Sequence, residues 1–218
     1  MDRSLIIGAS GGIGAALADA LPGEVVGLSR SRDDLDVTDG DSVARVLSAL
    51  EGPFDRIVLA TGILAPEGGA PEKAMARVDA GAMAQVLAVN AIGPALVLGQ
   101  VPRLLPKDGR AVVAVLTARV GSIGDNRIGG WHSYRASKAA ANMIVRGAAI
   151  EMGRSHKQAI CVALHPGTVA TPFTADYASR HRTVPAPEAA ANLIAVMDGL
   201  APQQSGGFYD YAGKEIPW

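Results

Sequence analysis

The sequence predicts an α/β fold, a doubly wound parallel sheet of about seven strands with helices on both faces. Short, unbroken apolar runs alternate with longer segments of helical periodicity along the whole chain. A parallel sheet that is covered on both faces needs strands of this kind. The chain has 218 residues, 49% of them hydrophobic, and shows no repeat or linker, so we expect one domain over residues 1–218.

The predicted elements alternate regularly. Strands are expected at Leu5–Gly8, Glu24–Leu28, Leu35–Val37, Arg56–Ala60, Ala111–Leu116, Ala159–Leu164 and Phe208–Tyr211. Helices are expected at Ile13–Leu21, Asp39–Leu50, Ala80 to about Leu105, Trp131–Arg154 and Pro187–Leu200. Asp39 or Asp41 could cap the second helix. This is the pattern of a Rossmann fold, in which ligands bind at the carboxyl ends of the strands.

Composition excludes several classes of function. The net charge is -1 with 19% charged residues, which provides no basic surface for nucleic acid. The one cysteine, Cys161, cannot form an internal disulfide. The apolar run Leu5–Ile7 is too short for a secretory signal, and no segment approaches the ~20 apolar residues of a membrane span. We therefore expect a soluble cytoplasmic protein with no membrane, nucleic-acid or metal partner.

A glycine-rich turn joins the first strand to the first helix. Glycines let the backbone turn there and approach a ligand, and the following helix N-terminus attracts a phosphate. The residues predicted to contact a dinucleotide are Gly8, Ser10, Gly11, Gly12, Ile13 and Gly14.

The end of the second strand favours NADP(H) over NAD. A carboxylate at this place binds the ribose hydroxyls of NAD, whereas a basic side chain suits the extra phosphate of NADP. The strand is followed by Ser29, Arg30 and Ser31, and no acid occurs before Asp33. Arg30 can make charge-assisted hydrogen bonds to a phosphate, and the two serines can add hydroxyl donors.

Tyr134 and Lys138 carry the most specific chemical signal. They lie four residues apart at the start of a helix and so share one face. A free phenol has a pKa of ~10, and a nearby ammonium favours its ionised form. Tyr134 can then give a proton to a carbonyl oxygen while NADPH gives a hydride, and Lys138 can also hold the ribose.

The glycine spacing GxxxGxG and the Tyr-x-x-x-Lys motif together resemble the short-chain dehydrogenase/reductase superfamily, over nearly the whole chain. The resemblance implies that Asp36 and Val37 meet the adenine and that Asn90 holds a water beside Lys138. The segment Leu59-Ala60-Thr61-Gly62 is similar to the superfamily's NNAG segment but lacks its asparagines. We therefore expect Ala60, Thr61 and Gly62 to contact the cofactor through their backbone. The segment after His165 resembles the one that cradles the nicotinamide, and its expected contacts are Pro166, Gly167, Thr168, Val169 and Thr171.

The superfamily's substrate-binding serine has no clear counterpart. Alignment of the strand end places Ala118 at that position, whereas the spacing back from Tyr134 points between Gly121 and Ser122. Either Thr117 or Ser122 supplies the hydroxyl, with Ser122 preferred, or no hydroxyl serves and turnover is poor.

Segments 119–126, 129–131 and 208–218 are similar to sniffer-like and C-factor-like carbonyl reductases. That resemblance implies NADPH-dependent reduction of an aldehyde or ketone. The predicted lid, residues 172–185, is short and suggests an open site of modest selectivity. A non-catalytic NADP(H)-binding redox sensor and another reaction, such as epimerisation or dehydration, remain alternatives. The Ala-rich helices near 80–105 and 131–154 suggest a homodimer or homotetramer.

Overall fold

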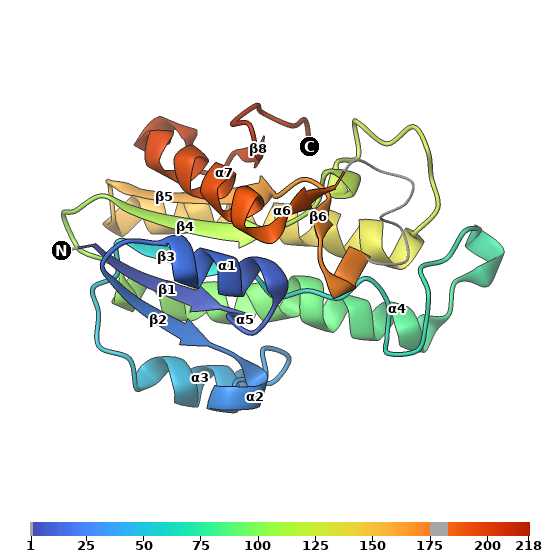
Figure 1. The fold of residues 1–218 in the computed structure, drawn as a ribbon, viewed down its shortest axis with the longest axis horizontal. Coiled ribbons are helices and arrows are strands. Elements are labelled where there is room, and N and C mark those ends of the chain that lie inside the picture. Colours follow the sequence, from blue (N-terminus) through green and yellow to red (C-terminus); the bar gives the residue numbers. More distant parts are fainter. Residues whose placement is uncertain (1, 175–182) are drawn as a thin grey trace.

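A six-stranded parallel sheet forms the centre of the computed structural model, which describes residues 2–174 and 183–218 (Figure 1). The strand order is β2-β1-β3-β4-β5-β8, and every neighbouring pair is parallel. The strands are β1 (Arg3–Ile7), β2 (Glu24–Leu28), β3 (Arg56–Leu59), β4 (Ala111–Leu116), β5 (Ala159–His165) and β8 (Phe208–Asp210). The chain runs outward from β1 to β2 and then returns to place β3 on the other side of β1. The predicted doubly wound architecture is confirmed.

Helices cover both faces of this sheet (Figure 1). On one face α1 (Gly12–Ala20) packs beside α7 (Ala186–Gly199), and on the other lie α3 (Gly40–Ser48), α5 (Gly93–Gln100) and α6 (His132–Ser155). Successive side chains of a strand point to opposite faces of the sheet and enter different hydrophobic clusters. Leu5 and Ile7 belong to one cluster, and Ile6 belongs to the other. This alternation explains why the strands are apolar throughout.

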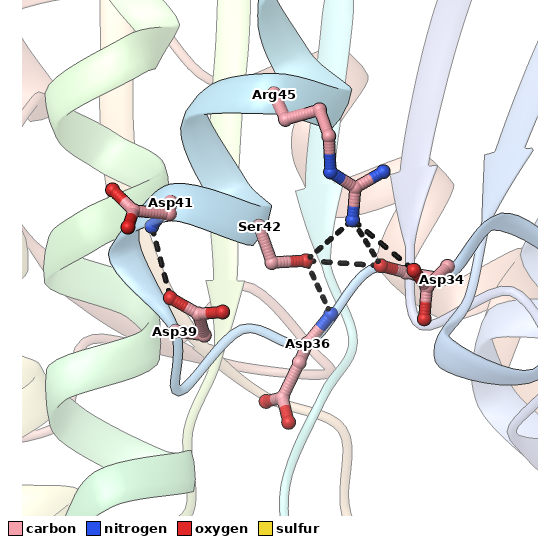
Figure 2. A network of polar contacts seen from close by, with 6 residues as sticks. All are labelled: Asp34, Asp36, Asp39, Asp41, Ser42 and Arg45. Carbon is pink, nitrogen blue, oxygen red and sulfur yellow. Dashed lines mark hydrogen bonds and ion pairs between the residues drawn. The ribbon is translucent and has the colours of Figure 1, made fainter.

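Six predicted strands and all five predicted helices form within a few residues of their expected ends. Asp39 caps α3, since its Oδ1 accepts from the Asp41 N–H (3.0 Å, Figure 2). The predicted strand Leu35–Val37 is wrong. Both of its apolar side chains are buried, but the chain turns through a left-handed Asp34 (φ 52°), and the Asp36 N–H donates to the Ser42 hydroxyl instead of a neighbouring strand. A single short helical turn, α2 (Arg30–Asp33), precedes it and was not predicted.

The helical stretch Ala80–Leu104 is long and apolar enough, by length and composition, to cross a membrane. The expectation that no segment approaches the ~20 apolar residues of a membrane span is therefore wrong. The stretch comprises α4 (Ala80–Leu87), a π-helical turn (Ala88–Ile92), α5 and a 3₁₀ turn. It packs along α3 and α6 and buries nine residues: Val86, Asn90, Ala91, Gly93, Pro94, Val97, Leu98, Val101 and Leu104. A core helix of a sheet protein meets the same criterion of length and hydropathy.

A small second ladder lies beyond the end of β5. Strand β6 (Val169–Ala170) pairs in parallel with β7 (Val184–Pro185), so the two ends of the intervening segment meet. The predicted lid over 172–185 covers most of this segment and β7, and its residues 175–182 lie outside the described part of the chain.

Candidate active site

Two adjoining grooves run along the carboxyl edge of the sheet, where the strand order reverses between β1 and β3. The first has a volume of about 790 Å³ and the second about 510 Å³. Both are lined by Ser10, Gly11, Ala60, Thr61 and Gly62, so they are continuous. Of the other predicted residues, the first groove holds Gly8, Ser29, Arg30, Ser31, Asp36 and Val37. The second holds Gly12, Ile13, Thr117, Tyr134, Lys138, Pro166, Gly167, Thr168, Val169 and Thr171.

The glycine turn forms the wall between the two grooves. Gly8 has φ +95°, and a Cβ there would lie 2.9 Å from the carbonyl carbon of Ala60, so the ends of β1 and β3 meet only through glycine. Gly14 does not line a groove; a Cβ there would lie 2.2 Å from the Gly8 carbonyl oxygen. No side chain caps the start of α1 at Gly11. The uncapped amides and the close-packed turn fit a phosphate group.

The end of β2 presents a basic side chain and no acid to the first groove. Arg30 and Ser31 are exposed, line the groove and make no side-chain hydrogen bond within the described residues. The Asp33 carboxylate turns back and accepts from the Ser29 N–H (2.7 Å). The Ser29 hydroxyl accepts from the Arg32 N–H at the start of α2, so this serine has a structural role besides lining the groove.

A polar network fixes the loop that carries Asp36 (Figure 2). The Ser42 hydroxyl accepts from the Asp36 N–H (3.0 Å) and donates to the Asp34 carbonyl (2.9 Å), and Arg45 donates to the same carbonyl (3.1 Å). The Asp36 carboxylate points away from this network and accepts from the Thr38 hydroxyl and N–H. These two bonds lower the pKa of Asp36, so its carboxylate is ionised at the wall of the groove.

Tyr134 and Lys138 come together in the second groove, at the start of α6. The Tyr134 ring is buried between Trp131 (ring centroids 6.2 Å apart) and Phe173 (6.1 Å). Lys138 Nζ lies 5.8 Å from the centre of the Tyr134 ring and donates to the Leu116 carbonyl (3.0 Å). Burial raises the pKa of Tyr134 and lowers the pKa of Lys138 to about 8. Near neutral pH the phenol therefore holds its proton and most of the lysine is charged.

Asn90 lies in the π-helical turn, buried behind this pair. Its Nδ2 donates to the Ile63 carbonyl (2.7 Å) and the Ser137 hydroxyl (3.0 Å), and its Oδ1 accepts from the Ile63 N–H (2.8 Å). The side chain thus ties the loop after β3 to α6 at Ser137, the residue before Lys138. Both N–H donors are used, which leaves only Oδ1 in this side chain to hold the water that the resemblance predicts.

No predicted hydroxyl faces the substrate side of the groove. Ser122 lies outside both grooves; its hydroxyl donates to the Pro217 carbonyl and accepts from the Asp125 N–H (3.0 Å). The preference for Ser122 is therefore corrected: its hydroxyl holds the segment near Pro217. Thr117 lines the groove, but its hydroxyl oxygen is itself buried and has no partner among the described residues. Ala118 lines the groove, so the geometry favours the alternative in which no hydroxyl serves.

Sequence reasoning missed the residue that caps α6. Trp131 precedes this helix in a left-handed conformation and offers no side-chain cap. The Glu72 carboxylate accepts instead from the Ser133 N–H (3.2 Å) and from the Ser133 hydroxyl, while the Glu72 carbonyl accepts from the Trp131 N–H (2.5 Å). Burial raises the pKa of Glu72, but the hydrogen bonds from Ser133 outweigh it and the pKa is lowered. No local signal marks Glu72, which lies 61 residues before Ser133.

The fold and this site define an oxidoreductase of the short-chain dehydrogenase/reductase class. The family model described as enoyl-(acyl carrier protein) reductase matches residues 11–198, and the chain belongs to that family, within the short-chain dehydrogenase/reductases. C-signal from Myxococcus xanthus is 39% identical over 145 residues, 66% of this chain and 84% of that protein. Three other curated relatives are longer, and the chain spans 55% to 58% of their length.

Solved structures share the whole fold. The carbonyl reductase Sniffer of D. melanogaster has a TM-score of 0.84 and 22% identity, with each chain covered completely. NADPH-bound carbonyl reductase from chicken fatty liver has a TM-score of 0.83 and 23% identity, with 100% of this chain and 99% of that one covered. At these identities the likeness shows the fold alone.

Replacement of Glu72 by alanine is expected to lower the free energy of unfolding by ~1–2 kcal/mol, because the N-terminus of α6 loses its cap. Urea denaturation at neutral pH measures this change. Glu67→Ala, in the same loop but with no hydrogen bond to α6, is the matched control. Equal stabilities of the two variants would contradict the capping role.

Proposed function

We propose that this protein is an NADPH-dependent carbonyl reductase that converts an aldehyde or ketone to an alcohol. The observation that carries the proposal is the placement of the buried Tyr134–Lys138 pair in a groove continuous with the phosphate-binding glycine turn. A bound NADPH supplies the hydride. The chain's own residues then have to hold the carbonyl carbon near the nicotinamide and provide one proton.

Tyr134 is the proton donor in this proposal. Its raised pKa keeps the phenol protonated near neutral pH, which suits donation to a carbonyl oxygen that becomes an alkoxide. The Lys138 ammonium stabilises the phenolate that remains, because an opposite charge nearby favours the ionised form. The hydrogen bond from Lys138 to the Leu116 carbonyl fixes that ammonium at the end of β4.

The first groove supports NADP(H) over NAD. Arg30 lines this groove and makes no side-chain hydrogen bond or ion pair within the described residues, while Asp33 is turned away toward Ser29. A guanidinium can bind the extra phosphate through paired charge-assisted hydrogen bonds. The NADPH-bound chicken carbonyl reductase, which has the same fold, supports this assignment of the groove.

A second candidate function is a non-catalytic NADP(H)-binding redox sensor. One observation favours it: Ala118 stands where the family places its substrate-binding serine, and neither Thr117 nor Ser122 offers a hydroxyl to the groove. The buried Tyr134–Lys138 pair favours the reductase, because a sensor has no need of a positioned proton donor.

Tyr134→Phe is expected to lower the rate of NADPH oxidation with an active aldehyde or ketone by ~10²–10⁴-fold, since it removes the general acid. NADPH binding, measured by fluorescence titration, should be retained. Activity would be assayed against a panel of aldehydes, ketones and quinones. Tight NADPH binding without turnover in either protein would favour the sensor, and equal turnover in both would exclude Tyr134 as the donor.

The reductase activity should fall as the pH rises through about 8. The pKa of Lys138 is lowered to about 8 by burial, so above that pH the ammonium loses the charge that stabilises the phenolate. The profile of kcat/KM against pH reports this group in the free enzyme. Lys138→Arg keeps its charge at all accessible pH values, and any residual activity should lack the fall. A wild-type profile that stays flat well above pH 8 would contradict this role.

Arg30→Ala is expected to weaken NADPH binding by roughly tenfold to a hundredfold, the range for lost hydrogen bonds to a charged group. Binding of NADH should change little, because NADH lacks the extra phosphate. Arg32→Ala is the matched control, since Arg32 carries the same charge on α2 but does not line the groove. Equal losses for both cofactors would refute the phosphate contact.

We further propose that the protein forms a homodimer or homotetramer in the cytoplasm. Met143 and Ile150 are exposed (71% and 53%) seven residues apart on α6, and nothing lies within 4 Å of a Cβ built on Gly147 between them. This apolar stripe suits contact with a second copy. Sedimentation velocity should show an oligomer that Met143→Glu dissociates, and a monomeric wild-type protein would refute the proposal.

A further inference from the structure

The second groove is lined by basic side chains, and the acid that pairs with one of them, Asp125, lies outside the groove lining. Within the described residues its wall includes Arg119 and Lys138 and no aspartate or glutamate. The Lys138 ammonium is buried and bonded to the Leu116 carbonyl. Arg119 is the charged group that an incoming molecule can reach, since its side chain is 51% exposed.

Arg119 is held close to the proton donor. It begins a 3₁₀ turn, Arg119–Gly121, directly after β4 and Ala118. Arg135 of α6 donates to the Val120 carbonyl (3.2 Å), and a Cβ on Gly121 would lie 2.7 Å from the carbonyl carbon of Lys138. The turn is therefore fixed against the helix that carries the catalytic pair.

The guanidinium of Arg119 is held in one orientation, but only one of its three nitrogens makes a hydrogen bond within the described residues. Its Nε donates to the Asp125 carboxylate (2.5 Å), and the Asp125 N–H is held by the Ser122 hydroxyl. Its two terminal nitrogens have no partner among the described residues. A guanidinium carries five N–H donors, so the edge away from Asp125 can bind a second carboxylate.

A histidine in the same groove adds no positive charge. His165 lines the groove and is half-buried, and its buried Nδ1 has no partner among the described residues. Burial lowers the pKa of His165 to about 4; the Asp210 carboxylate opposes this shift, and the positive charge of Arg119 adds to it. The imidazole is thus neutral near pH 7, and Arg119 is the exposed charged side chain among the described residues of the groove.

We propose that Arg119 binds an anionic group of the substrate, so that the preferred substrates are carbonyl compounds that also carry a carboxylate. This inference rests on the proposed reductase function and names its substrate class. Neither Ala118, at the usual serine position, nor the buried Thr117 hydroxyl gives the carbonyl oxygen a second donor beside Tyr134. An ion pair between Arg119 and a carboxylate at the other end of the substrate then orients the carbonyl group toward Tyr134.

The test compares two substrates that differ in charge, 4-carboxybenzaldehyde and its methyl ester. The ratio of their kcat/KM values is measured for wild type, Arg119→Gln and Arg127→Gln. Arg127 is a matched control: it lies exposed on the same loop, outside both grooves. We expect wild type and Arg127→Gln to prefer the acid by roughly tenfold, through KM, and Arg119→Gln to lose that preference. An unchanged ratio in Arg119→Gln, or a wild-type preference for the ester, would overturn the proposal.

A binding measurement separates this proposal from the reductase function. Calorimetry measures the binding of 4-(hydroxymethyl)benzoate to each protein saturated with NADP⁺. Binding that weakens about tenfold in Arg119→Gln alone supports the anion site even if no turnover occurs, in which case only the reductase proposal fails. Equal binding by all three proteins, or no binding by wild type, overturns the anion site whatever the activity.

Discussion

The reversal of strand order between β1 and β3 is the constraint on which the rest of the structure depends. Because β2 and β3 flank β1, the connections that leave β1 and β3 run to opposite faces and leave the carboxyl edge open between them. Gly8 lets the two strand ends approach, and the groove follows from that contact. The end of β2 carries Arg30 to this edge, and the start of α6 carries Tyr134 and Lys138.

Burial gives Tyr134 and Lys138 their complementary protonation states. The same apolar surroundings oppose charge on both groups, and so raise one pKa and lower the other. A phenol that holds its proton suits reduction, whereas the reverse reaction needs the phenolate. The apolar environment is thus consistent with the proton donation proposed for Tyr134.

Much of the fold, and the placement of Tyr134 beside Lys138, could be predicted from the sequence because the signals are local. The apolar runs mark the strands, and the motif at Tyr134 places its own helix. The strand expected at Leu35–Val37 failed because its alternating apolar residues report burial, which a packed loop also provides. Ser122 and Glu72 could not be assigned because their partners lie 95 and 61 residues away, and no spacing rule reaches that far.

The π-helical turn at Ala88–Ile92 makes the geometry of the site depend on the number of residues in its helix. Such a turn accommodates one more residue than an α-helical turn, and here it presents the Asn90 amide to Ile63 and Ser137. Deleting one residue from this turn would restore regular α-helical geometry and remove the local bulge that carries Asn90, while the flanking helices kept nearly the same faces. The amide would then leave its partners. Homologous chains that keep this site must therefore keep the extra residue, even where every neighbouring apolar side chain has been exchanged.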